Sequence, residues 1–411
     1  MRLRMGASLL IIVLLLGSVI GYSVLREDTQ QQLTAQWVST PQWSLESNHH
    51  SPTGVTVDGE TFVAVPLNSR QAEHCRLRVL DGNGTERWHA DLPESSCTVH
   101  SISDPTIADY DQDGRLEIIA ATSQKTLVGY DLRTGEKELV HQLTSLGYSK
   151  PIVTNFTGTQ APETIVADLL GGVFALNANG TEIWRRNFPD ARVRQPAIAD
   201  FDADGAPELV IGQIEGTVVL LENNGSTAWR ANLSDVTSAK WMTTGQADED
   251  SPKEIVLTTF SGTVIALDGA HGAVQWRRDF DATGATVHSL GDGDGDGQAE
   301  VYVAARDGVV RSLDASNGTV EWATTLTTEE SIVGPPPTLG DIDGDEASEL
   351  VAVSNAGVVS VVDPKTGEIQ STYKREVPIN KYPRLKNLDA DPADEIIVIY
   401  GDGSVAVLTV G

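Results

Sequence analysis

The strongest constraint on this chain is a sequence unit of about 46 residues that recurs along most of its length. Alignment on the last acidic residue of each unit gives intervals of 46, 45, 46, 46, 49 and 46 residues between Glu117, Glu163, Glu208, Glu254, Glu300, Glu349 and Glu395. No linker or low-complexity segment interrupts the series. Such a period is typical of architectures in which each unit buries its faces against its neighbours.

Each unit contains several short runs rich in Val and Ile, such as ELVIGQI followed by GTVVLLEN. These runs are too short for helices and are typical of paired strands. A turn follows, often Asn-Gly, and then a third run with Trp four residues after the turn glycine: Gly84 and Trp88, Gly180 and Trp184, Gly225 and Trp229, Gly272 and Trp276, Gly318 and Trp322. A fourth run, such as QPAIADF, leads into the next acidic motif. Four antiparallel strands in 40 to 50 residues are typical of a propeller blade.

We therefore predict an all-β fold, an eight-bladed β-propeller of four-stranded antiparallel blades that spans residues 29–411. The chain stops after two strands of its last unit, and strands from the N-terminal end, near Trp37 and Trp43, would complete that blade. Seven blades are the alternative, because residues 33–60 diverge from the repeat. A solenoid of stacked hairpins competes with both, but ring closure removes exposed sheet edges.

The N-terminal residues 1–28 form a different kind of segment. Gly6 to Leu25 includes no charged side chain, and Arg2 and Arg4 precede it. About twenty apolar residues match the thickness of a hydrocarbon core. We predict an uncleaved transmembrane signal-anchor helix, with a removed signal peptide as the alternative. The rest of the chain would then face outward as a single-pass protein of the cell membrane.

The charge balance narrows the set of partners. The chain has a formal net charge of −29, with 58 acidic and 29 basic residues, of which nine are Lys. Phosphate would be repelled, which argues against nucleic acid and anionic membrane surfaces as direct partners. Abundant carboxylate with little lysine resembles proteins of extreme halophiles and suggests a halophilic archaeon, whereas an ordinary acidic secreted protein is the alternative.

The acidic motif itself, as in DFDADGAPE from Asp200 to Glu208, predicts a metal site. Carboxylates at alternate positions repel one another unless a cation lies between them, and glycine at the sixth position allows the sharp turn of a cation loop. Hard oxygen ligands favour Ca²⁺ over Zn²⁺. We expect about five Ca²⁺ sites, each joining strands within the ring rather than forming a ligand-binding site. The alternative is that these loops are solvated acidic turns.

The copies differ in completeness. Three have every ligand and the glycine: Asp109, Asp111, Asp113 and Glu117; Asp200, Asp202, Asp204 and Glu208; Asp292, Asp294, Asp296 and Glu300. Two keep the side-chain ligands but have Glu346 or Pro392 at the sixth position: Asp341, Asp343, Asp345 and Glu349; Asn387, Asp389, Asp391 and Glu395. The copy with Gln246, Asp248, Asp250 and Glu254 is weaker, and NFTGTQAPE at 155–163 is predicted to bind no metal.

Two family resemblances follow from these motifs. The D-x-D-x-D-G-x-x-E loops resemble the calcium-binding FG-GAP repeats of integrin-α-type propellers. ALDGAHGAVQW resembles the repeat of quinoprotein-type (PQQ-like) propellers. Together the resemblances cover roughly residues 50–411 and imply structural metal loops and a partner bound on one face of the ring. Neither resemblance specifies a function.

Other residues give weaker signals. Cys75 and Cys97 flank a predicted hairpin, and we expect a disulfide between them rather than two buried thiols. The Trp series suggests packing between blades rather than a sugar-stacking platform. The eight histidines show no metal-ligand spacing, and His49 and His50 are interpreted as incidental loop residues. Six sequons permit glycosylation at Asn83, Asn155, Asn179, Asn224, Asn232 and Asn317.

The sequence favours a non-enzymatic scaffold that binds or adheres to an unknown protein or glycan at the cell surface. An envelope protein-assembly factor of the quinoprotein-like type is the first alternative. PQQ-dependent dehydrogenases resemble a longer chain with large insertions, and many carry a vicinal cysteine pair, whereas this chain has nearly constant units and no vicinal pair. A carbohydrate-active enzyme would need paired carboxylates or basic residues in a central pocket, and no His-rich or Arg-rich insertion supplies them.

Overall fold

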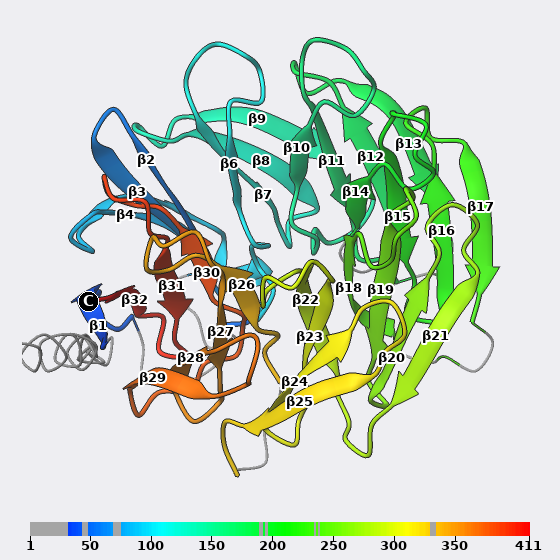
Figure 1. The fold of residues 1–411 in the computed structure, drawn as a ribbon. Helices are drawn as coiled ribbons and strands as arrows, with labels where there is room; N and C mark the ends of the chain where they lie inside the picture. The colour runs from blue at the N-terminus through cyan, green and yellow to red at the C-terminus, as the bar shows by residue number, and fades with distance from the viewer. Residues whose placement is uncertain are drawn as a thin grey trace, which may run out of the picture. The chain divides into compact units, whose positions relative to one another are not determined.

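The computed structural model describes residues 32–42, 48–68, 75–188, 192–193, 196–233, 236, 239–328 and 334–411. Within them lie eight four-stranded antiparallel sheets, arranged around a ring in Figure 1. The predicted signal-anchor, residues 1–28, lies outside the described residues. Among those that are described, no helix is long and apolar enough to cross a membrane.

Seven sheets are formed by consecutive strands. The first sheet contains β2 (Thr53–Val57), β3 (Glu60–Leu67), β4 (Arg76–Asp81) and β5 (Glu86–Asp91), and the second contains β6 (Thr106–Ala108), β7 (Glu117–Ala121), β8 (Thr126–Asp131) and β9 (Lys137–Gln142). The third contains β10 (Ile152–Thr154), β11 (Glu163–Ala167), β12 (Gly172–Leu176) and β13 (Glu182–Asn187), and the fourth contains β14 (Ala197–Ala199), β15 (Glu208–Gly212), β16 (Thr217–Leu221) and β17 (Thr227–Asn232). The fifth sheet contains β18 (Ala239–Gly245), β19 (Glu254–Thr259), β20 (Thr263–Leu267) and β21 (Val274–Asp279), and the sixth contains β22 (Thr286–Gly291), β23 (Glu300–Ala304), β24 (Val309–Asp314) and β25 (Val320–Thr325). The seventh contains β26 (Thr338–Gly340), β27 (Glu349–Val353), β28 (Val358–Val362) and β29 (Ile369–Lys374).

The eighth sheet joins the two ends of the propeller. It contains β30 (Arg384–Lys386), β31 (Glu395–Ile399), β32 (Val405–Val410) and, at its outer edge, β1 (Leu33–Val38). Strand β1 pairs antiparallel with β32 from Leu33 opposite Val410 to Val38 opposite Ala406, and the two strands lie side by side in Figure 1. The prediction of eight blades is therefore confirmed, and the seven-bladed alternative is wrong.

The first strand of each sheet lies nearest the ring centre. Most of these strands contact their counterparts in neighbouring sheets, and β2 contacts both β6 and β30. The sheets that begin with β10 and β14 share a core, so the ring is closed. The second strands, such as β15, and most residues of the third strands are buried, whereas outer strands such as β17 are largely exposed. Adjacent sheets share cores, for example Val210 and Leu220 packed with Leu257 and Leu267. Burial of these apolar faces holds the blades together.

The tryptophans of the outer strands link each blade to the next. The indole N–H of Trp229 donates to the carbonyl oxygen of Gly269 at 2.7 Å, and that of Trp276 donates to Ala315 at 2.7 Å. At the turn that Trp229 covers, Gly272 has φ +70°, and a Cβ there would lie 2.7 Å from the indole ring. Only glycine satisfies both conditions. The interpretation of the Trp series as packing between blades is confirmed.

A disulfide joins Cys75 and Cys97, whose Cα atoms are 5.6 Å apart. It brackets the β4–β5 hairpin and the short 3₁₀ helix η1 (Glu94–Ser96). The six sequon asparagines are all exposed, and Asn83, Asn179, Asn224 and Asn317 lie in turns between the third and fourth strands of their sheets.

Candidate functional site

The acidic motifs form the loops between the first and second strands of their blades. In the blade that begins at β14, the loop starts at Asp200 directly after Ala199 and ends at Glu208, the first residue of β15. The closing glutamate of each loop therefore enters the sheet interior, where Glu117, Glu208, Glu254, Glu300 and Glu395 are at most 2% exposed.

Backbone hydrogen bonds orient the carboxylates within each loop. One oxygen of the closing glutamate accepts the N–H of the second loop residue, at 2.7 Å from Phe201 to Glu208 and at 2.9 Å from Gly293 to Glu300. The first aspartate accepts the N–H of the sixth residue, at 3.1 Å from Gly205 to Asp200. Gly205 has φ +91°, so glycine is favoured there. These bonds turn the remaining oxygens toward the loop centre.

Each of several loops gathers carboxylate oxygens within 4.8 Å of one another: Asp292, Asp294, Asp296 and Glu300; Asp109, Asp111 and Glu117; Asp200, Asp202 and Glu208; Asp248, Asp250 and Glu254; Asp341, Asp343 and Glu349. The group at Asp248 belongs to the copy that the sequence ranks as weaker. Such sets of hard oxygen donors have the chemistry of a Ca²⁺ site.

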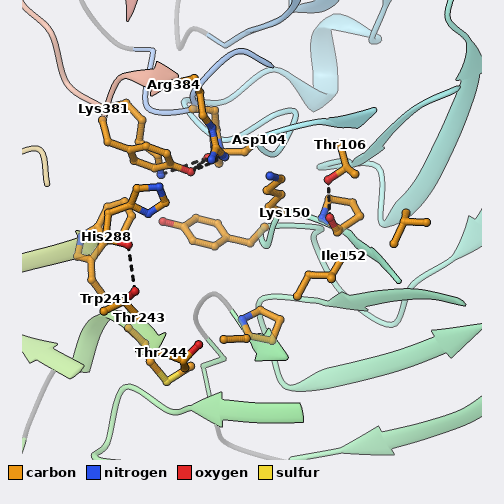
Figure 2. Close-up of a pocket in the computed structure, with 18 residues that line it drawn as sticks. Asp104, Thr106, Lys150, Ile152, Trp241, Thr243, Thr244, His288, Lys381 and Arg384 are labelled. Carbon is orange, nitrogen blue, oxygen red and sulfur yellow. Dashed lines mark hydrogen bonds and ion pairs between the residues drawn. The ribbon is translucent and has the colours of Figure 1, made fainter. Parts of the chain in front are cut away.

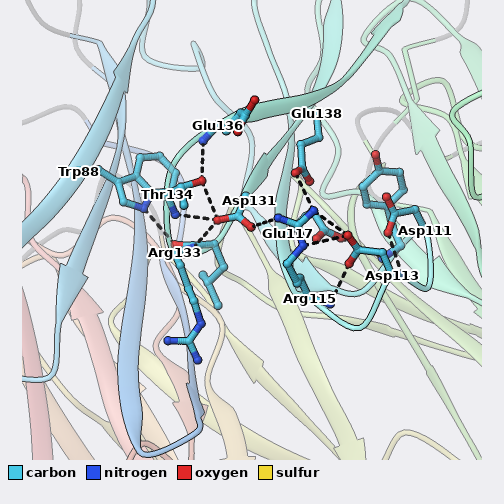
Figure 3. A network of polar contacts seen from close by, with 12 residues as sticks. Trp88, Asp111, Asp113, Arg115, Glu117, Asp131, Arg133, Thr134, Glu136 and Glu138 are labelled. Atoms are coloured by element: carbon cyan, nitrogen blue, oxygen red, sulfur yellow. Dashed lines mark hydrogen bonds and ion pairs between the residues drawn. The ribbon is translucent and has the colours of Figure 1, made fainter.

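The first complete loop contains its own counter-ion. Figure 3 shows Arg115 between Asp113, Asp131 and Glu138, and its guanidinium lies 2.6 Å from Asp113, 2.9 Å from Asp131 and 3.2 Å from Glu138. Asp113 is therefore drawn toward Arg115, while Asp111 and Glu117 remain grouped with Asp109.

The last loop differs at its first and sixth positions. Asn387 donates its side-chain amide to the carbonyl oxygen of Asp391, and Glu395 accepts the N–H of Leu388 at 2.6 Å. Pro392 lacks an N–H and cannot make the bond that Gly205 makes in its loop. Asp389 and Asp391 keep the third and fifth positions of the predicted site.

The surroundings of the closing glutamates disfavour their ionised form. Burial and the neighbouring aspartates raise the pKa of Glu117 to about 8 and the pKa of Glu208, Glu254, Glu349 and Glu395 to about 7. Several buried oxygens in these loops have no hydrogen-bond partner, among them Oδ1 of Asp109 and Asp200 and Oε1 of Glu117, Glu254 and Glu395. A cation would coordinate those oxygens and stabilise the ionised form of the glutamates.

In the loop at 155–163, hydrogen-bond donors of the loop itself compensate the charge of the closing glutamate. Glu163 accepts the N–H groups of Phe156 at 2.8 Å and Thr157 at 3.0 Å on one oxygen. Its other oxygen accepts the hydroxyls of Thr157 at 2.5 Å and Thr159 at 2.8 Å. Although burial opposes it, this set of donors lowers the pKa of Glu163.

A second candidate site lies at the ring centre, at the opposite end of the first strands from the acidic loops. A cavity of about 520 Å³ is lined by residues of or just before β6, β10, β14, β18, β22 and β30, and by His50 before β2. Figure 2 shows Lys150, His288, Lys381 and Arg384 facing this space.

A buried carboxylate organises one wall of the cavity. Asp104 is 4% exposed and accepts hydrogen bonds from His50 Nδ1 at 2.7 Å and from the Tyr382 hydroxyl at 2.5 Å. Lys381 and Arg384 lie 3.8 and 3.6 Å from it. Burial alone would raise the pKa of Asp104, but Lys381 and His50 hold it well below its usual value. The interpretation of His50 as an incidental loop residue is wrong, because His50 is buried against Asp104.

Sequence reasoning missed this second site because its residues come from separate blades. A signal was present, since Asp104, Lys150, Trp241 and Tyr382 each lie five residues before the first residue of an acidic motif. The cations of this site belong to no single His-rich or Arg-rich insertion, because closure of the ring brings them together from separate blades.

Closed rings of four-stranded antiparallel blades define the β-propellers, and the ring described above belongs to this class. The chain belongs to the family whose model is described as outer membrane protein assembly factor BamB, which matches residues 34–214 and again 214–409. None of the curated proteins matches the sequence.

Solved structures with the same fold differ widely in function. BamB from Moraxella catarrhalis has a TM-score of 0.61 and 18% identity over 92% of this chain and 97% of its own. The biofilm matrix protein Bap1 of V. cholerae has a TM-score of 0.70 and 13% identity over 92% of this chain and 91% of its own. A quinohemoprotein alcohol dehydrogenase from Pseudomonas putida HK5 has a TM-score of 0.64 and 11% identity over 93% of this chain and 76% of its own. At these identities the likeness shows the fold alone.

Proposed function

We propose that this protein is a non-enzymatic protein-binding scaffold of the BamB-like type whose first-to-second-strand loops are held by Ca²⁺. The family match supports a role in protein assembly, since the family is described by an assembly factor. The observation that carries the calcium proposal is the repeated group of carboxylate oxygens within 4.8 Å at the same position of successive blades. About five such ions would stiffen the loops on one face of the ring, so that this face presents a fixed surface to a partner.

We propose a location for the scaffold as well. A membrane anchor in residues 1–28 would hold the propeller at the outer side of the cell membrane, where a disulfide such as Cys75–Cys97 persists.

The test is affinity purification of the full chain from detergent-solubilised cells, with and without a calcium chelator. We expect a stoichiometric protein partner that chelation releases, because the loops would lose their fixed geometry. Purified protein that carries an absorbing small cofactor, and no protein partner, would contradict the scaffold and favour an enzyme. A partner retained fully in chelator would separate binding from the calcium loops.

A further inference from the structure

The cavity at the ring centre has the dimensions of a small-molecule site. Its volume of about 520 Å³ lies within the range of ligand pockets in proteins. Strand residues form part of the wall, among them Thr106 of β6, Ile152 of β10, Ala197 of β14 and Thr243 of β18, and the segments just before the first strands form the rest. Preformed walls lower the entropy cost of binding.

The cavity is positively charged in a chain that is otherwise strongly acidic. Lys150, Lys381 and Arg384 line it, and among the described lining residues Asp104 is the only carboxylate. The side chains of Lys381 and Arg384 are 14% and 12% exposed. Three basic side chains against one carboxylate leave a local surplus of positive charge, although the whole chain carries −29. A surplus of buried positive charge favours an anionic ligand.

The basic groups of the cavity repel one another, and this repulsion lowers the pKa of some of them. Burial, together with Arg384, lowers the pKa of Lys150 to about 7. Burial and the cations Arg384 and Lys381 lower the pKa of His288 to about 3, so the imidazole is neutral. An anion bound among Lys150, Lys381 and Arg384 would relieve this repulsion.

Aromatic faces lie beside the cations. The rings of His288 and Tyr382 are 4.1 Å apart, and Trp241 meets Tyr382 edge-on at 5.7 Å. The ammonium of Lys381 lies 4.4 Å from the centre of the Trp241 ring. The indole N–H of Trp241 is buried without a hydrogen-bond partner. Aromatic faces beside fixed cations suit a ligand that has a ring as well as a charge.

We propose that this cavity binds a small organic anion built on a ring, with its carboxylate or phosphate among Lys150, Lys381 and Arg384 and its ring against Trp241. The ligand can be a free metabolite or the terminal residue of an acidic glycan, because both present the same chemistry. This binding would not depend on the protein partner or on the calcium loops, which lie at the other end of the first strands.

The test is calorimetric titration of the calcium-loaded chain with four probes: glucuronate, glucose 6-phosphate, glucose and inorganic phosphate. Both ring-bearing anions should bind, glucose should not bind, and inorganic phosphate should bind at least tenfold more weakly than glucose 6-phosphate. Glucose binding as tightly as glucuronate, or no binding of either ring-bearing anion, would overturn the proposal. A glucuronate-terminated tetrasaccharide distinguishes the sources, since a glycan ligand requires that it bind at least as tightly as free glucuronate.

Lys150→Met supplies the residue test, because methionine keeps the length of the side chain and removes its charge. Loss of a charge-assisted contact should weaken binding of the ring-bearing anion about tenfold. Lys365→Met is the matched control: Lys365 is an exposed residue in the turn between β28 and β29, outside the cavity, and its variant should bind within about twofold of the parent. Equal losses in both folded variants would show a general charge effect and contradict the proposal.

Discussion

Glu163 and Glu208 occupy the same position in neighbouring blades, yet their surroundings compensate their charge in different ways. Glu163 is surrounded by the hydroxyls of Thr157 and Thr159, and its pKa is lowered. Glu208 faces Asp200 and Asp202, and burial first and these acids second raise its pKa to about 7. A buried carboxylate at this position is unfavourable unless hydrogen-bond donors or an opposite charge compensate it. Where threonines do not supply them, a bound proton or a cation can compensate the charge instead.

The largest test of this contrast is removal of divalent cations from the whole protein. If about five sites are occupied at concentrations far above their dissociation constants, each contributes a few kcal/mol to the free energy of unfolding. Chelation should then lower the melting temperature on the order of 10 °C, as scanning calorimetry would show. Readdition of Ca²⁺ should restore it, and an unchanged melt would remove the calcium proposal.

The pH dependence of the chelated protein is the second test. The folded-state pKa of Glu117 is about 8 and that of Glu208 about 7, both above the ordinary value of 4.5. Without metal, the protons on these groups stabilise the folded state fully below that ordinary value, and this contribution is lost as the pH rises to about 8. Chelated protein should therefore lose stability across that window.

Calcium should abolish this loss, because the ion replaces the protons. Glu163 contributes with the opposite sign: its lowered pKa stabilises the fold above the ordinary value and stops doing so as the pH falls. If the melting temperature of the chelated protein is flat or rises between about pH 5 and pH 8, the raised pKa of the closing glutamates is contradicted.

A pair of variants tests single blades. Asp202→Asn with Glu208→Gln should reduce the calcium stoichiometry by one and lower stability only when Ca²⁺ is present. Glu163→Gln should leave the stoichiometry unchanged and cost about 1–3 kcal/mol with or without Ca²⁺, because the amide nitrogen cannot accept the hydrogen bonds that Glu163 accepts. Metal analysis and denaturant titration measure both effects. Loss of every ion in the first variant would show that the sites are coupled.

The smallest expected effect comes from converting one loop into the other. Thr157→Asp with Thr159→Asp places carboxylates at the third and fifth positions of the loop that ends at Glu163. The variant should bind one additional Ca²⁺ and become less stable than the parent in chelator, because Glu163 loses two hydroxyl donors. A folded variant with unchanged stoichiometry would show that spacing alone does not make the site.

Sequence reasoning succeeded where the determinants are local. The strand runs, the Asn-Gly turns and the Trp residues lie within one unit, so a period of about 46 residues predicted eight blades and the packing of residues such as Trp229. The grouping of Asp200, Asp202 and Glu208 was likewise expected from spacing. Occupancy by Ca²⁺ stays a prediction.

The central cavity could not be predicted because it depends on closure of the ring. His50 and Asp104 lie 54 residues apart, and Asp104 and Tyr382 lie 278 apart, but both pairs are hydrogen-bonded. His288 belongs to an irregular part of β22, where the register shifts between Val287 and Ser289. No rule based on spacing within a unit identifies such partners.

The pairing of β1 with β32 has a consequence for how the chain reaches its native state. Ser39 and Val405 exchange hydrogen bonds of 2.8 and 2.9 Å across 366 residues of sequence. During synthesis from the N-terminus, Leu33–Val38 is made before the seven other sheets, and its edge stays unpaired until Val405–Val410 has been made after them. Closing so distant a contact is slow, and the unpaired edge is the point at which two nascent copies could exchange strands.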